Sequence, residues 1–77
     1  MFDPNKRSCV IAMPSLTFAL QGETLLDNVG IYVRVIKLPA NATKKGCAYG
    51  LEVSCVFLEE AAQRLRAKNI KHGELLT

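Results

Sequence analysis

The stretch Cys9–Leu38 decides the fold, and its sequence is CVIAMPSLTFALQGETLLDNVGIYVRVIKL. The apolar run Cys9–Met13 predicts a buried strand that ends at Pro14, because proline interrupts a strand ladder. Ser15 follows as a natural N-cap, and apolar residues then recur at helical spacing as far as Val29. The stretch therefore opens with a strand that leads directly into an amphipathic helix.

The remaining elements follow from the same kind of pattern. Gly30 is placed to end the first helix, because a left-handed residue commonly follows a helix. The β-branched run Ile31–Leu38 then predicts a second strand. Three further elements complete the chain: a strand with alternating apolar residues at Cys47–Cys55, a helix at Leu58–Lys68 and a weak strand at Ile70–Leu75.

The element order is thus β-α-β-β-α-β, with two similar halves joined by the loop 39–46. It predicts an α+β fold of the ferredoxin-like, split βαβ type. This fold has a four-stranded antiparallel sheet in the order 4-1-3-2, with both helices on one face. We expect a tail at 1–8, a single domain at 9–77, and a homodimer through the uncovered face of the sheet.

Composition excludes several classes of protein. The chain has 77 residues, of which 49% are hydrophobic and 22% are charged, so it is long and apolar enough for one small domain. A net charge of +3 and the lack of tryptophan argue against a nucleic-acid partner. Apolar runs are too short to span a membrane, and the polar start 1–7 lacks the apolar core of a secretion signal. We expect a cytoplasmic protein.

The three cysteines are Cys9, Cys47 and Cys55. An odd number in a chain without a secretion signal predicts free thiols, and their spacing with His72 does not form a metal site. In the predicted topology Cys9 and Cys55 lie together at the lower edge of the sheet. We expect both to be plain buried core residues.

Cys47 differs, because the topology brings it close to the start of the first helix. The amide groups and dipole at the N-terminus of a helix stabilise an anion, and nearby lysines favour a thiolate. The sequence therefore predicts a thiolate site. The residues expected to stabilise the anion are Ser15, Leu16, Thr17, Lys44, Lys45 and Gly46.

Three segments in this order resemble a known family, the selenium/sulfur carrier protein-like domains. They are Met13–Leu20 (MPSLTFAL), Leu25–Ile36 (LLDNVGIYVRVI), and Pro39 followed by Gly46-Cys47 and Gly50-Leu51. The resemblance covers about positions 9 to 72 and departs from the family where Ala48 follows the cysteine in place of glycine.

The resemblance implies a cytoplasmic carrier rather than a catalyst. Cys47 would accept sulfur or selenium, with Pro14, Arg34 and Gly50 in supporting positions. No cofactor is expected beyond a covalent persulfide or perselenide on Cys47. The implied partners are proteins that donate and accept the atom.

Two other functions compete with the carrier. One is a binding or regulatory module that dimerises through the open sheet face and uses no thiol chemistry. The other is a thiol–disulfide protein, for which Cys47 lacks a resolving partner. Cys55 is eight residues further along an extended strand, roughly 26 Å away at ~3.3 Å per residue.

Overall fold

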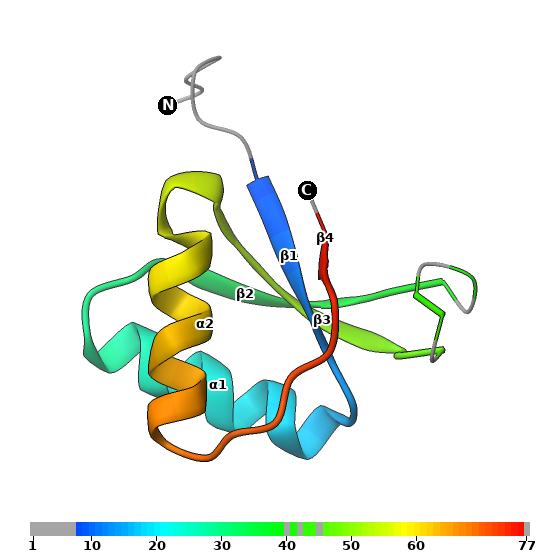
Figure 1. Ribbon diagram of the computed structural model, residues 1–77, viewed down its shortest axis with the longest axis horizontal. Coiled ribbons are helices and arrows are strands. Elements are labelled where there is room, and N and C mark those ends of the chain that lie inside the picture. Colours follow the sequence, from blue (N-terminus) through cyan, green and yellow to red (C-terminus); the bar gives the residue numbers. More distant parts are fainter. Residues whose placement is uncertain (1–7, 40, 42, 45, 77) are drawn as a thin grey trace.

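The strands and helices occur in the predicted order in the computed structural model, which describes residues 8–39, 41, 43–44 and 46–76 (Figure 1). Lys45 and most of the predicted tail 1–8 lie outside the described residues. The elements are β1 (Ser8–Met13), α1 (Leu16–Asn28), β2 (Val33–Lys37), β3 (Tyr49–Ser54), the 3-10 helix η1 (Cys55–Phe57), α2 (Leu58–Ala67) and β4 (Leu75–Leu76). This confirms the α+β class and the β-α-β-β-α-β order.

The four strands form one antiparallel sheet in the order β2-β3-β1-β4. This is the predicted order 4-1-3-2 counted from the other edge. β1 and β3 pair along their whole lengths, with Met13 opposite Tyr49. β3 begins two residues later than predicted, although the Leu38 N–H still donates to Ala48 O (2.8 Å).

α1 begins and ends where its sequence predicts. Ser15 is the N-cap, and its side chain accepts a hydrogen bond from the Phe18 N–H (3.3 Å). Gly30 follows the helix with a φ of +83°, a conformation that favours glycine. Within the helix, a Cβ on Gly22 would lie 2.6 Å from Leu51 Cδ1, so the missing side chain lets α1 approach the sheet closely.

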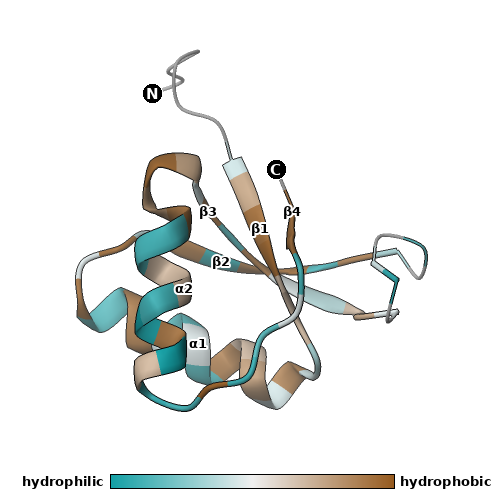
Figure 2. Cartoon of the chain, in the orientation of Figure 1, coloured by the Kyte–Doolittle hydropathy of each residue, from teal (hydrophilic) through white to brown (hydrophobic). Residues whose placement is uncertain are grey.

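Both helices cover the same face of the sheet. Apolar side chains from β1 and β3 alternate onto this face and pack against α1 and α2. Figure 2 shows hydrophobic and hydrophilic bands alternating along α2, which matches a helix with one buried side. The largest fully buried side chains are Ile11, Met13, Leu26, Leu51, Leu65 and Val53.

The last part of the chain runs from the end of α2 along β1 (Figure 1). We call Asn69–Glu74 the return segment. Asn69 has a φ of 58°, the left-handed conformation that commonly follows the end of a helix. The predicted strand Ile70–Leu75 is wrong over most of its length, since β4 contains only Leu75–Leu76. The segment Lys71-His72-Gly73 has little strand propensity, and its residues line a pocket instead.

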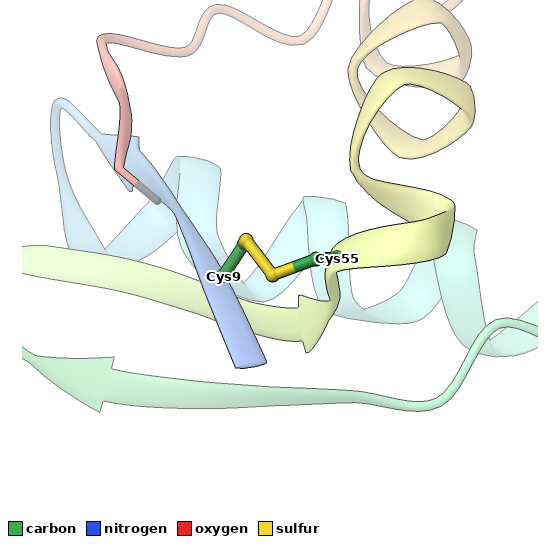
Figure 3. The surroundings of a disulfide bond; sticks show 2 residues. All are labelled: Cys9 and Cys55. Atoms are coloured by element: carbon green, nitrogen blue, oxygen red, sulfur yellow. A yellow bond between two sulfur atoms is a disulfide. The ribbon is translucent and has the colours of Figure 1, made fainter. Parts of the chain in front are cut away.

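Cys9 and Cys55 form a disulfide bond between β1 and the start of η1 (Figure 3). The expectation that both thiols are free is therefore wrong, whereas Cys9 is buried in the core as expected and Cys55 is partly buried against it. β1 and β3 pair with Ser8 opposite Ser54, and η1 then turns Cys55 toward Cys9, to a Cα–Cα distance of 4.9 Å. Such a separation is within the range that a disulfide spans.

No helix in the part of the chain that the structure describes is long and apolar enough to cross a lipid bilayer.

Candidate functional site

A pocket of about 700 Å³ lies beside the free cysteine. Its walls come from four places in the fold. Pro14 follows β1, Gly46 and Cys47 precede β3, Arg66 lies near the end of α2, and Asn69–Gly73 belong to the return segment. Segments from both halves of the chain therefore enclose it.

Cys47 is the free thiol of the three cysteines, and it is 8% exposed. Its backbone N–H donates to Thr43 Oγ1 (2.8 Å), a buried hydrogen bond. On the other side, a Cβ placed on Gly73 would lie 3.3 Å from Cys47 Sγ. The sulfur thus lies against the return segment, in the wall of the pocket.

Among the described residues, three hydrogen bonds hold the loop before Cys47 in place. Gly46 has a φ of +69°, and its N–H donates to Thr43 O (3.3 Å). Thr43, which is 6% exposed, also accepts from Cys47 through its hydroxyl. The Lys44 N–H donates to Glu74 Oε1 (3.0 Å), which ties the loop to the return segment. Thr43 and Glu74 were not predicted as site residues.

At the start of α1, the predicted supporting residue Pro14 lines the same pocket as Cys47, whereas the predicted anion-stabilising residues Ser15, Leu16 and Thr17 are not among its lining residues. Ser15 caps the helix directly after Pro14. Leu16 and Thr17 are exposed. A contact between the sulfur and the amides of Leu16 and Thr17 stays a prediction.

Two of the supporting residues lie elsewhere in the sheet. Arg34 Nε is 3.9 Å from Glu52 Oε1, and these two residues face each other across β2 and β3. Gly50 lies under Val10 and Leu38, where a Cβ would come within 2.6 Å of Val10 Cγ1. Neither Arg34 nor Gly50 lines the pocket.

The pocket is also lined by three basic residues that were not predicted as site residues: Arg66, Lys71 and His72. Arg66 and Lys71 are exposed at its rim, and His72 is half-buried. The two ion pairs among the described residues are Arg34–Glu52 and Arg64–Glu60, so Arg66 and Lys71 have no carboxylate partner there. The predicted strand order could have placed His72 and Lys71 near the site, because it brings the last segment of the chain back beside the first strand.

His72 has one ring nitrogen engaged with the backbone. Its Nδ1 is 2.8 Å from Gly73 O, and because a carbonyl oxygen only accepts, Nδ1–H is the donor. Nε2 is then the nitrogen left for other partners. The described residues contain no cluster of three side chains suited to a metal ion.

Together the fold and the site define a class of protein: a small split βαβ domain with one free thiol in a basic pocket. Residues 8–76 match the family described as "Putative Se/S carrier protein-like". The chain belongs to this family, which confirms the resemblance found in its sequence. No curated protein and no solved structure matches the chain significantly.

Proposed function

We propose that this protein carries a sulfur or selenium atom on Cys47. The atom comes from a donor persulfide or perselenide and passes to an acceptor. The observation that supports the proposal most directly is that Cys47 alone of the three cysteines is free, and that it lines a pocket. Membership of the carrier-like family supports the same function.

The transfer needs no oxidant or reductant. The Cys47 thiolate attacks the terminal sulfur of a donor R–S–SH, a new S–S bond forms to Cys47, and the donor S–S bond breaks. The donor thiolate leaves with the electron pair of that bond. Delivery reverses the roles: an acceptor nucleophile attacks the terminal atom, and the Cys47 thiolate leaves. A terminal selenium atom passes by the same two displacements.

The surroundings of Cys47 suit an anionic sulfur. A persulfide there would lie among Arg66, Lys71 and the polar backbone of the loop, and positive charge stabilises it. We further propose that the amides of Leu16 and Thr17 assist from the start of α1. Burial of the sulfur would limit side reactions of the carried atom.

The test is to incubate the protein with glutathione persulfide and to measure its intact mass. We expect a gain of one sulfur atom, about 32 Da, that peptide mapping places on Cys47. Cys47→Ser should lose this gain. Addition of a thiol acceptor should remove the atom and return the original mass.

The disulfide requires its own control, because persulfides also react with disulfides. Cys9→Ala/Cys55→Ala leaves Cys47 as the one cysteine of the chain. This double variant should still gain one sulfur atom. Absence of the adduct from both the native protein and the double variant would overturn the carrier function.

The compartment that we propose is the cytoplasm, as the family resemblance implies. Disulfides are rare in that compartment, so the Cys9–Cys55 bond calls for a direct measurement. Rapid acid quenching of cells followed by alkylation would report its state there. We expect a substantial share of the protein to contain the disulfide in cells. If both cysteines are reduced in all of the protein and Cys47 still accepts a sulfur atom, the disulfide is not needed for the carrier function.

A further inference from the structure

We propose that the pocket beside Cys47 selects a small anionic donor, one whose sulfane sulfur is attached to a negatively charged leaving group. Thiosulfate and a carboxylate-bearing persulfide have this chemistry. The proposal rests on the proposed function, because it names the class of donor for the same thiol.

The position of the sulfur favours a small donor. Cys47 is 8% exposed and lies behind the return segment, with Gly73 against its sulfur. A cysteine on the folded surface of another protein would have to enter this pocket to reach the buried sulfur. A molecule of a few heavy atoms fits a pocket of about 700 Å³ without rearrangement.

The charges of the pocket favour an anion. Arg66 and Lys71 contribute positive charge from two different segments, and no acidic side chain is among the lining residues. Glu74 is the adjacent carboxylate in the chain, and its Oε1 accepts a hydrogen bond from the Lys44 N–H. Arg66 and Lys71 are themselves free of carboxylate partners among the described residues. A guanidinium group can bind an oxyanion with two parallel hydrogen bonds.

His72 adds a polar group to the same wall. Because Nδ1–H donates to Gly73 O, the ring is held against the backbone of the next residue, and Nε2 is the nitrogen that can bind another group. This nitrogen can accept a proton from an approaching thiol or, once protonated, donate to an oxyanion.

With thiosulfate as donor the step balances. The Cys47 thiolate attacks the outer sulfur, a Cys47–S bond to that sulfur forms, and the bond to the sulfonate sulfur breaks. The leaving group is sulfite, which takes the electron pair. One thiolate and thiosulfate become one persulfide anion and sulfite, with equal charge on both sides.

The preference for anions can be measured without any sulfur transfer. Iodoacetate and iodoacetamide both alkylate the same thiolate, but only iodoacetate is charged. The ratio of their rate constants on Cys47, compared with the ratio for the urea-unfolded chain, therefore reports the local potential. We expect the folded protein to raise this ratio roughly threefold to tenfold. High salt should reduce the increase, since screening shortens to about 3 Å at 1 M.

Matched variants assign the effect to the pocket. Arg66→Gln and Lys71→Gln should each remove a large part of the increase. Arg64→Gln serves as the control, because Arg64 lies on the same helix but pairs with Glu60 outside this pocket. An unchanged ratio in Arg66→Gln and Lys71→Gln, or an equal fall in Arg64→Gln, would overturn the proposal.

Donor assays separate this inference from the carrier function. A carboxylate-bearing persulfide should load Cys47 faster than its own methyl ester, and Arg66→Gln should lose that difference. Thiosulfate should also load Cys47, more slowly in Arg66→Gln than in the native protein. If the ester and the carboxylate load Cys47 at equal rates, anion selection is refuted, and the carrier function is not affected. Loading only by a persulfide on a protein would likewise refute it, whereas failure of every donor would refute the carrier function itself.

Discussion

Gly73 and Cys47 are packed against each other, so that a Cβ on Gly73 would lie 3.3 Å from Cys47 Sγ. The same Cβ would lie 3.5 Å from Ala12 Cβ and from the carbonyl oxygen of Ala12. Gly73 also donates its N–H to that oxygen (2.6 Å), so its backbone is held against β1. Since the backbone cannot easily withdraw, an added methyl group has to displace the sulfur.

Gly73→Ala is therefore expected to slow the reaction of Cys47 with iodoacetamide, by roughly threefold to tenfold, because the methyl group crowds the sulfur. Timed alkylation followed by mass spectrometry measures the rate. Gly30→Ala is the matched control: its Cβ meets nothing within 4 Å, but its φ of +83° makes the substitution destabilising. A rate in Gly73→Ala equal to that of the native protein would contradict the packing.

Thr43→Val should release the loop in front of Cys47. The substitution keeps the shape of the side chain but removes the hydroxyl that accepts the Cys47 N–H. We expect a loss of about 1–3 kcal/mol in the free energy of unfolding, because the buried N–H is left without its partner. Urea titration measures this loss, and Cys47 should also be alkylated faster. Thr43→Ser keeps the acceptor and should lie close to the native protein on both measurements; if both variants behave alike, the hydrogen bond is not what holds the loop.

Gly22→Ala tests how closely α1 lies on the sheet. Alanine improves helix propensity by about 1 kcal/mol, whereas overpacking a core costs about 1–3 kcal/mol. The new Cβ would lie 2.6 Å from Leu51 Cδ1 and 3.1 Å from Leu65 Cδ2, so we expect the packing cost to exceed the gain. Thermal unfolding measures the net change. Thr24→Ala, at an exposed position of the same helix, should be neutral or slightly stabilising; a higher melting temperature in Gly22→Ala would show that the sheet yields.

Much of the fold could be predicted because its signals are local. Ser15 and Gly30 mark the two ends of α1 by their own capping and backbone preferences. The alternation along β3 assigns Leu51 and Val53 to the covered face, where both are buried. The order β2-β3-β1-β4 could be predicted because the split βαβ fold is the compact way to place both helices on one face of a four-stranded sheet.

The site was harder to predict because its residues meet only through tertiary structure. Cys47 stood out by its chemical type, but Arg66 and Lys71 resemble any solvated residues until the return segment is placed beside β1. The disulfide was missed for another reason. The predicted topology placed Cys9 and Cys55 at the same edge of the sheet, but it did not show that η1 turns Cys55 toward Cys9, and an odd number of cysteines predicts free thiols.

The Cys9–Cys55 bond should contribute strongly to stability, because it closes a long loop in a small domain. The two cysteines are 46 residues apart in sequence, and closing a loop of that length stabilises by up to about 4 kcal/mol in the chain-entropy account. A domain of this size has a limited core, so this is a large share of its stability.

Cys9→Ala/Cys55→Ala should accordingly lower the free energy of unfolding by about 2–4 kcal/mol, measured by urea titration. Addition of dithiothreitol to the native protein should produce a loss of similar size and should produce little change in the double variant. The bond and Cys47 lie at different ends of β3, so the folded double variant should keep its Cys47 alkylation rate. If dithiothreitol does not change the stability, the disulfide is either absent from the protein in solution or does not stabilise it. Alkylation under denaturing conditions distinguishes the two: if the disulfide is absent, Cys9 and Cys55 are alkylated as well as Cys47.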